Sequence, residues 1–270
     1  MLYHSMTSTN HVLTALVTGS TRCNGIGLGI AKCLAKNHNM NIILHGTRDR
    51  ATKEVEKCQS DLAKEYNVSV HYIQADLSTS SGAQQLCEQI DGIYPDGIDV
   101  LVNNAGDGHQ NLVEDVPLQK WESVLTINLT SPFVLIKHFI PAMKKRGWGR
   151  IINISSVLGV RAHAKSAVYT SSKHGLNGLT KVVGKEAADT GVTCNAVSPG
   201  WVETELYLKT LDKKVKTDGI SKEEAKTILM NPTKKYVTPE QIGENVSFLC
   251  SRAADNTTCA VLNIDGGCSS

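Results

Sequence analysis

Three polar side chains in the second half of the sequence could act together on a carbonyl oxygen. Tyr169 and Lys173 stand four positions apart in a helix-length segment, so they share one face of that helix. A free tyrosine has a pKa near ~10, and a nearby ammonium stabilises the phenolate and lowers that pKa. Ser156, thirteen residues before Tyr169, offers a hydroxyl at the end of an apolar run. Together they could hold and protonate a carbonyl oxygen, as hydride reduction of a ketone requires.

The elements that would position these side chains alternate between apolar runs and helical patterns. Short runs rich in Val and Ile predict buried parallel strands at Val12–Val17, Met40–Leu44, Val68–Gln74, Ile98–Val102, Arg150–Ile154, Thr193–Val197 and Ala260–Ile264. Helix-length segments lie between them at Gly27–Lys36, 55–66, 81–90, 118–145 and 166–188, and a last helix begins with a capping-box pattern at Thr238. This alternation predicts an α/β fold with a doubly wound, mostly parallel seven-stranded sheet in a single domain.

Two regions fall outside this alternation. Residues 1–11 have neither an apolar stretch nor arginines, so we expect a flexible N-terminal extension before a catalytic domain of residues 12–270. Residues 205–237 are rich in lysine and acidic residues, and they follow the carboxyl end of a strand, where open α/β sheets bind ligands. A helical lid over the substrate and a solvated surface excursion both fit this composition.

A site for a dinucleotide hydride donor is predicted where the first strand meets the first helix. The segment Thr18-Gly19-Ser20-Thr21-Arg22-Cys23-Asn24-Gly25-Ile26-Gly27 puts glycines at both ends of that turn, so backbone amides can approach a pyrophosphate. After the third strand, Asp76-Leu77 can accept the adenine amino group. After the fourth, the side chains of Asn103-Asn104-Ala105-Gly106 can pin neighbouring loops while Gly106 admits the cofactor. Simple turns use the same residue types, but the order of the three elements favours a dinucleotide site.

The end of the second strand bears on the choice between the two nicotinamide dinucleotides. An acidic residue there binds the ribose 2′-hydroxyl of NAD, whereas a basic residue accommodates the 2′-phosphate of NADP. No carboxylate occupies the first positions after Leu44, while Thr47 can donate to a phosphate and Arg48 can bind it with two hydrogen bonds. The segment favours NADP(H), and NAD(H) remains possible if the turn brings Asp49 to the ribose.

In this order along the chain, the motifs resemble the short-chain dehydrogenase/reductase family, from Val12 to Gly267, with a Rossmann-type fold. The resemblance implies that Tyr169 transfers the substrate proton, that Lys173 lowers its pKa and holds the nicotinamide ribose, and that Ser156 orients the substrate oxygen. It also implies that Asn128 carries a water in a proton relay, and that the enzyme is a homotetramer. The implied cofactor contacts are Gly19, Thr21, Arg22, Gly25, Ile26, Gly27, Thr47, Arg48, Asp76, Leu77, Asn104, Ala105, Gly106, Tyr169, Lys173, Pro199, Gly200, Val202 and Thr204, the last at the nicotinamide amide.

Within that family the sequence is most similar to bacterial-type D-3-hydroxybutyrate dehydrogenases, but it differs where those relatives hold the substrate carboxylate. Their Gln, His, Lys and Gln correspond here to Gly108, Leu158, Ser166 and Thr210, and Lys165 stands beside Ser166 as a possible substitute. A carboxylate without a charged partner binds poorly in a partly buried pocket. We therefore expect a less charged or larger ketone or secondary alcohol, contacted by Gly108, Leu158, Lys165 and Trp201. Trp201 could equally pack in the core.

The cofactor turn also departs from the family pattern. Five residues separate Gly19 from Gly25 where relatives usually have three, so Cys23 and Asn24 stand as an insertion that makes the loop bulge.

The composition argues against several other classes of protein. The net charge is +2, without a basic stripe that would indicate nucleic-acid binding, and no run approaches the ~18 apolar residues of a membrane span. The eight cysteines form no C-x-x-C pair and no cluster with zinc spacing, so we expect no metal and free thiols in a reducing compartment. We expect a cytoplasmic enzyme that acts on a small-molecule ketone or alcohol.

Three alternatives use the same fold. The substrate could still be D-3-hydroxybutyrate, or the chain could be a lyase or epimerase that uses the cofactor without net redox change. A dinucleotide-binding protein without catalysis is the third, but such a protein would be expected to lose Tyr169 or Lys173, and both are present.

Overall fold

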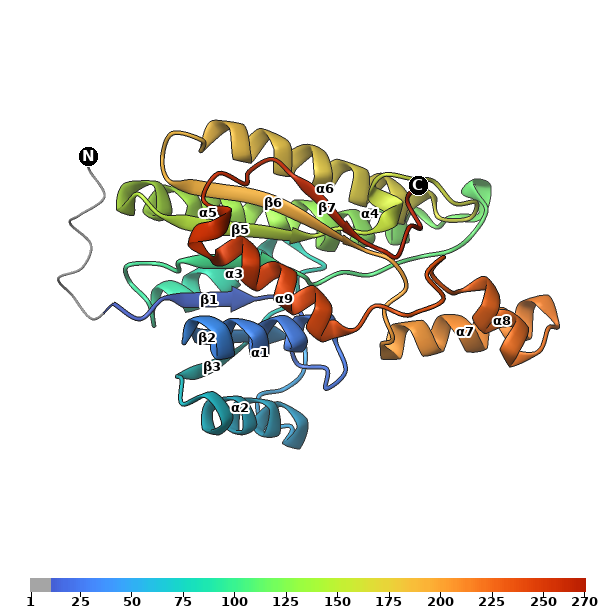
Figure 1. Cartoon of the computed structure of the whole chain (residues 1–270), viewed down its shortest axis with the longest axis horizontal. Coiled ribbons are helices and arrows are strands. Elements are labelled where there is room, and N and C mark those ends of the chain that lie inside the picture. The colour runs from blue at the N-terminus through green and yellow to red at the C-terminus, as the bar shows by residue number, and fades with distance from the viewer. Residues whose placement is uncertain (1–10) are drawn as a thin grey trace.

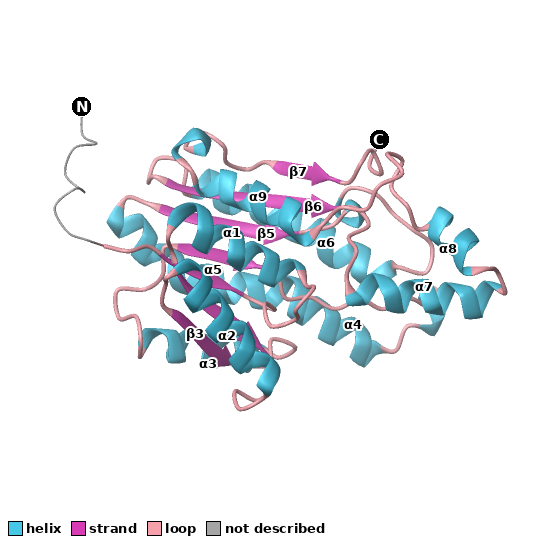
Figure 2. Ribbon diagram, turned by 60° about the horizontal axis from the view of Figure 1, so that its bottom comes forward, coloured by secondary structure: helices cyan, strands magenta, loops and turns pink. Residues whose placement is uncertain are grey.

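The computed structural model describes residues 11–270, and its centre is a seven-stranded sheet. The strands are β1 (Thr14–Val17), β2 (Asn41–Gly46), β3 (Val70–Gln74), β4 (Val100–Asn103), β5 (Gly149–Ile154), β6 (Val192–Pro199) and β7 (Val261–Ile264). Their order is β3-β2-β1-β4-β5-β6-β7, and every neighbouring pair is parallel (Figure 2). The predicted fold is confirmed.

Helices cover both faces of the sheet (Figure 1). On one face lie α1 (Ile26–His38), α2 (Lys53–Tyr66) and α9 (Pro239–Cys250), and α1 packs closely along α9. On the other lie α3 (Ser80–Asp91), α4 (Leu118–Leu125), α5 (Ser131–Arg146) and α6 (Ala167–Glu186). Because the strands are apolar on both faces, each face has its own core. Val17 and Ile42 pack beneath α1, for example, whereas Leu16 and Ile43 pack on the opposite side.

The helix expected over 118–145 is interrupted by a π-helical segment, Thr126–Thr130, between α4 and α5. Here the Ser131 amide donates to the carbonyl of Thr126, five residues back, instead of the usual four. The extra residue turns Asn128 inward, where it is 1% exposed. The interruption therefore directs a polar side chain from an otherwise regular helix into the protein interior.

This continuous helix, Leu118–Arg146, is the one stretch of residues 11–270 with the length and hydropathy to cross a membrane. Its most apolar window has a mean hydropathy of 1.3. The helix also packs against α3, α6 and β5, and core helices of folded proteins share this composition. The finding is therefore weak support for a membrane span.

Residues 205–237 form a helical arm that projects beyond the sheet (Figure 1). It contains α7 (Glu205–Asp218) and α8 (Lys222–Ile228), capped at their N-termini by Thr204 and Ser221. The arm has a small core of its own, made by Tyr207, Leu211, Ala225 and Leu229. Such a packed arm differs from a solvated excursion, because it buries apolar side chains between its two helices.

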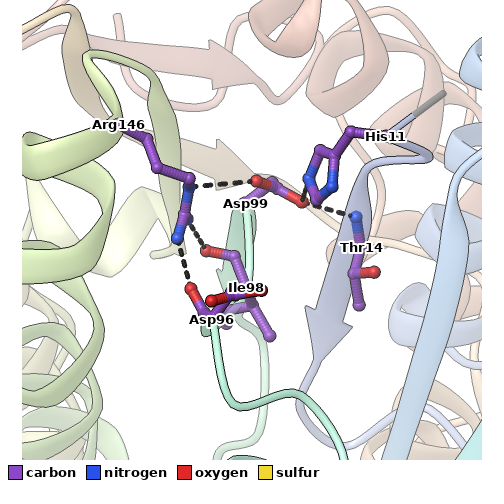
Figure 3. Close-up of polar contacts among 6 residues, drawn as sticks. All are labelled: His11, Thr14, Asp96, Ile98, Asp99 and Arg146. Carbon is purple, nitrogen blue, oxygen red and sulfur yellow. Dashed lines mark hydrogen bonds and ion pairs between the residues drawn. The ribbon is translucent and has the colours of Figure 1, made fainter. Parts of the chain in front are cut away.

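The buried carboxylate of Asp99 contacts several residues at the edge of the sheet opposite the carboxyl ends of the strands (Figure 3). Asp99 is 2% exposed, accepts a 2.8 Å hydrogen bond from the Thr14 amide, and pairs with the Arg146 guanidinium at 3.4 Å. His11 contacts the same carboxylate at 3.1 Å. The expected extension over residues 1–11 lies outside the described residues except for this histidine.

Candidate active site

The predicted site residues gather at the carboxyl ends of the central strands. The sheet order reverses at β1, which lies between β2 and β4, and ligands of open α/β sheets bind at such a switch point. Gly19 follows β1, Asn104 follows β4 and Ser156 follows β5. The topology thus brings three distant parts of the sequence to one edge.

The proposed acid–base group lies on α6, facing the end of β5. The Tyr169 hydroxyl is hydrogen-bonded to the Ser156 side chain. The Ser156 Oγ also accepts from the Leu158 amide at 3.2 Å, which fixes its orientation. Lys173 is 4% exposed, its Nζ lies 5.7 Å from the Tyr169 ring centre, and it donates to the Ile154 carbonyl at 2.8 Å. The three side chains expected to act on one carbonyl oxygen therefore do meet.

The protonation of this cluster differs from the simple expectation. Burial raises the pKa of Tyr169 above its usual value, and the Ser156 hydrogen bond opposes that rise. Burial lowers the pKa of Lys173 to about 8. Lys173 points its ammonium at the Ile154 carbonyl, so in this arrangement it does not offset the rise that burial causes in the pKa of Tyr169. Ser156 is the neighbour that favours the phenolate.

Asn128 clamps the loop that follows β4. Its Oδ1 accepts from the Asp107 amide at 3.0 Å, while its Nδ2 donates to the Asp107 carbonyl and to the Ser172 hydroxyl, each at 2.9 Å. A side chain at Gly106 would come within 3.0 Å of Asn128 Oδ1 and 3.7 Å of Lys173 Nζ. The amide of Asn128 is thus committed to positioning this loop.

The glycine motif and the loop after β4 lock together without room for side chains. Gly19 has a φ of +65°, and a Cβ there would lie 2.9 Å from Ala105. A Cβ at Gly27 would lie 2.6 Å from Asn104 Nδ2, which donates to the carbonyls of Thr18 and Gly19 at 2.8 and 3.0 Å. The expectation that an asparagine here pins neighbouring loops is confirmed.

The start of α1 has the properties of an anion site. Its N-cap, Gly25, makes no side-chain capping bond, and the first turn carries no acidic residue. The first amides of the helix, from Ile26 onward, therefore have no side-chain partner to satisfy them. Thr79, Thr204, Ser221 and Thr238 cap the helices that they precede, whereas α2, α4, α5 and α6 begin without a side-chain cap, as α1 does. These first amides of α1 could bind a pyrophosphate. The close contact of Gly27 with Gly19 sets how near the turn lies to the start of the helix.

The two inserted residues form the tip of a turn. The Gly25 amide donates to the Arg22 carbonyl at 2.9 Å, which leaves Cys23 and Asn24 exposed between them. The insertion therefore bulges outward, as expected, and Gly25 still reaches the start of α1. Thr21 stays buried, and its Oγ1 lies where a Cβ at Gly46 would collide, 2.7 Å away.

Beyond β2 the charges favour an anion. Asp49 accepts from the Ala51 amide at 2.8 Å, so its carboxylate is occupied by its own turn. Arg48 pairs with Glu54 in the first turn of α2, an ion pair with both side chains more than a third exposed. The pKa of Glu205, at the start of the arm, is lowered first by Lys209 but also by Arg22 and Arg48. Both arginines therefore lie near the start of α7, and Thr47, next to Arg48 in the chain, is exposed.

The remaining predicted cofactor residues line the same edge, with varied surroundings. Asp76 is exposed and accepts from Ser78, whereas Leu77 is buried. Pro199 ends β6, and a Cβ at Gly200 would collide with Asn231 at 2.5 Å. Val202 is buried at the base of the arm, and the Thr204 hydroxyl accepts from the Tyr207 amide at 3.3 Å. These last residues fix where the arm leaves the sheet.

Two of the predicted substrate residues lie beside the proposed acid–base group, and the other two have different surroundings. Gly108 lies against the Tyr169 ring, because a Cβ at Gly108 would be 3.5 Å from the Tyr169 ring atom Cδ2. Leu158 lies two residues after Ser156. Lys165 is exposed at a φ of +65°. Trp201 packs edge-on against Tyr207 in the core of the arm, so the structure gives it at least the packing role.

Two residues at this edge were not predicted. His45, at the end of β2, is 2% exposed and accepts from the Gly19 amide at 3.1 Å. Asn231, also 2% exposed, holds the base of the arm through hydrogen bonds to the amide and carbonyl of Trp201. A polar residue at the end of an apolar strand was the available signal for His45, whereas Asn231 stands in a segment without pattern.

Comparison with known proteins agrees with this geometry. The sequence profile of the short chain dehydrogenase family matches residues 13–214. D-beta-hydroxybutyrate dehydrogenase of Cupriavidus necator is 41% identical over 94% of this chain and 96% of its own length. A 3-oxoacyl-[acyl-carrier-protein] reductase of Aquifex aeolicus is 36% identical, again over 94% of this chain and 96% of the relative.

Solved structures share the fold closely. An actinorhodin polyketide ketoreductase with NADPH superposes with a TM-score of 0.87 at 33% identity, covering 96% of this chain and 97% of that chain. L-sorbose reductase of Gluconobacter frateurii, with NADPH and L-sorbose, superposes with a TM-score of 0.86 at 26% identity and the same coverage. The chain belongs to the short-chain dehydrogenase family and is an oxidoreductase of secondary alcohols and ketones.

Proposed function

We propose that the chain is an NADP(H)-dependent reductase or dehydrogenase of a neutral or bulky ketone and its secondary alcohol. The observation that carries this proposal is the meeting of Ser156, Tyr169 and Lys173 at the edge where the glycine motif opens α1. Proton-transfer groups and an anion site lie side by side, as a hydride-transfer enzyme needs.

The chain's own residues would divide the chemistry as follows. When bound, the nicotinamide cofactor supplies or accepts the hydride. Tyr169 would hold the proton that passes to or from the substrate oxygen at its Oη, and Ser156 Oγ would orient that oxygen. Lys173, buried beneath Tyr169, would hold the nicotinamide ribose and replenish the proton. Asn128 would keep the loop after β4 in place and carry a water on its backbone.

The choice of NADP(H) is supported by the charges beyond β2. Arg48 and Arg22 both lie near Glu205, Asp49 is occupied by its own turn, and the surface ion pair of Arg48 with Glu54 is weak enough to yield to a phosphate. Two structural relatives were solved with NADPH. Gly19, Gly25, Ile26, Gly27, Asp76 and Asn104 would hold the rest of the dinucleotide.

The arm of residues 205–237 would be the lid over the substrate. It leaves the sheet at the carboxyl end of β6, beside the site, and its packed core can move as one body. Gly108, Leu158, Lys165 and Trp201 would line the pocket beneath it. Leu158 in place of a polar residue favours a substrate without a small carboxylate.

The enzyme would work in the cytoplasm as a homotetramer. The eight cysteines are all free, as in a reducing compartment. Several large apolar side chains stand open to solvent, with Val113, Leu118 and Val182 more than half exposed and Phe133 nearly so. Burying them between copies of the chain would remove this apolar surface from water.

A substrate panel tests the proposal. Purified enzyme is given ketones and hydroxy acids of graded size and charge, each with NADPH or NADP⁺ and with NADH or NAD⁺, and the nicotinamide absorbance is followed. We expect turnover of neutral or bulky ketones with NADPH, with D-3-hydroxybutyrate much slower. Turnover without net change in the nicotinamide would instead identify a lyase or epimerase.

The second candidate is a D-3-hydroxybutyrate dehydrogenase, favoured by the 41% identity to the Cupriavidus necator enzyme over nearly the whole chain. In that case Lys165 would supply the missing positive charge. Lys165→Ala should then abolish activity on D-3-hydroxybutyrate, whereas under the first proposal Leu158→His should raise that activity.

A further inference from the structure

A pair of cysteines links the cofactor turn to the neighbouring helix. Cys23 stands exposed at the tip of the Arg22–Gly25 turn, and Cys58 is 5% exposed on α2. Both thiols line the same surface pocket, and Cys23 is close enough to Cys58 to raise the pKa of Cys58. Cys58 also donates to the Thr21 carbonyl at 3.7 Å.

The surroundings suit thiol chemistry. Both cysteines line an open surface pocket of about 490 Å³ between α1 and α2, together with Lys32 and Lys57. The pocket gives a small oxidant access to Cys23. Burial raises the pKa of Cys58 to about 11, Asp61 adds to that rise and Lys32 opposes it, so Cys58 remains a thiol until it meets an oxidised Cys23. No part of the proposed catalytic chemistry uses these groups.

We propose that Cys23 and Cys58 form a reversible disulfide that displaces the turn of the glycine motif and weakens NADP(H) binding. The effect on the nucleotide rests on the proposed function; the disulfide itself does not.

The oxidation balances with hydrogen peroxide as oxidant. The Cys23 thiolate attacks one peroxide oxygen, so an S–O bond forms, the O–O bond breaks, and the released hydroxide takes a proton to become water. The sulfur of Cys58 then attacks that sulfenic acid. An S–S bond forms, the S–O bond breaks, and the oxygen leaves with the thiol proton as a second water. The two electrons lost by the thiols reduce the peroxide, and a dithiol reverses the reaction.

The structure indicates which side must move. A disulfide holds its sulfur atoms ~2.0 Å apart, much closer than two thiols that are not bonded to each other. Cys58 is fixed in the core beneath α1, whereas Cys23 is at the tip of an exposed turn. The turn must therefore shift toward α2, and Cys58 loses the proton that it donates to Thr21. Thr21, Arg22 and Gly25 are the proposed cofactor contacts on that turn.

The experiment treats the reduced full-length protein with hydrogen peroxide, alkylates the remaining thiols, and maps the cross-linked peptides by mass spectrometry. NADPH affinity is measured by fluorescence titration before oxidation, after it, and after dithiothreitol. We expect a Cys23–Cys58 cross-link, an affinity at least about fivefold weaker, and recovery on reduction. Each variant is judged by its own oxidised-to-reduced affinity ratio.

Variants decide the assignment. Cys23→Ser, at an exposed position, should remove both the cross-link and the affinity change, and Cys58→Ser should do the same. Cys259→Ser, beside α6 and far along the chain from the turn, should keep both. Absence of the cross-link in wild type, a cross-link without an affinity change, or an affinity change that persists in Cys23→Ser would overturn the proposal. If the reduced protein binds no nicotinamide nucleotide, the proposed function fails, and the cross-link alone then decides whether the disulfide forms.

Discussion

The backbone amide of Gly19 donates a 3.1 Å hydrogen bond to Nδ1 of His45, which joins the glycine motif to the end of β2. The other ring nitrogen, Nε2, lies 3.2 Å from the Ala75 carbonyl at the end of β3 and donates to it. A neutral imidazole satisfies both bonds, since one nitrogen accepts and the other donates. Burial lowers the pKa of His45 to about 4, which keeps this form at neutral pH.

We predict that His45 makes stability depend on acidity. Its folded pKa of about 4 lies below the unfolded value of 6.5, so its contribution is complete above pH 6.5 and is lost as pH falls toward 4. At ~1.4 kcal/mol per pKa unit, the loss can reach about 3 kcal/mol. His45→Gln removes the titration, so the stability of this variant relative to wild type should rise as the pH falls from 6.5 toward 4. Urea unfolding at a series of pH values measures this change. The exposed His174, changed to Gln, serves as control; an unchanged pH dependence in His45→Gln would refute the assignment.

We predict that Tyr169→Phe abolishes turnover and leaves the cofactor site intact. The substitution removes only the hydroxyl that carries the proton, and general acid–base catalysis contributes ~10²–10⁴-fold to rate. The turnover number should fall by that factor, while NADPH affinity by fluorescence titration changes less than about threefold. Tyr66→Phe, which removes a hydroxyl bonded to Glu65 on α2, should leave the rate unchanged. A Tyr169→Phe enzyme with most of its activity would exclude this residue as the acid.

We predict that Arg48 discriminates between the two dinucleotides. Loss of its charged hydrogen bonds to a 2′-phosphate should cost ~1.5–3 kcal/mol, or about 10–100-fold in NADPH affinity, with little effect on NADH. Arg48→Ala tests this, and the exposed Arg50, also changed to Ala, is the matched control. Because Glu54 competes for Arg48, Glu54→Gln should strengthen NADPH binding modestly. Equal losses for both dinucleotides in Arg48→Ala would contradict the preference for NADP(H).

We predict that the buried charge of Lys173 lowers the free energy of unfolding at neutral pH. Its folded pKa of about 8 lies below the usual value of 10.5, so burial penalises the charged amine fully below pH 8. Between pH 8 and 10.5 the folded protein releases this proton before the unfolded chain does, and stability rises with pH. Relative to Lys173→Met, wild type should therefore gain up to about 3 kcal/mol over this range.

Unfolding of the two proteins in urea at a series of pH values measures that gain. Lys173→Met should also lose nearly all turnover, because the proton relay is broken. A difference in stability that stays constant from neutral to alkaline pH would show that the amine is not desolvated in the fold.

The sequence by itself determined the order of the strands and helices. Apolar runs such as Ile98–Val102 can only be buried as central parallel strands, and the alternation with helices leaves few topologies. It also determined which side chains would meet at the site, because Ser156, Tyr169 and Asn104 all follow or face the carboxyl ends of strands. These features depend on local pattern, which a sequence displays directly.

Only the tertiary structure decided how those groups interact. Lys173 points at the Ile154 carbonyl, and burial raises rather than lowers the pKa of Tyr169, because desolvation depends on everything packed around a side chain. In the sequence, the π-helical segment that turns Asn128 inward looks like ordinary helix, since one extra residue leaves hydrophobic periodicity nearly unchanged. The hydrogen bond of His45 with Gly19 and the pocket shared by Cys23 and Cys58 join residues far apart in the chain. Such contacts arise only when separate elements pack, and no local pattern records them.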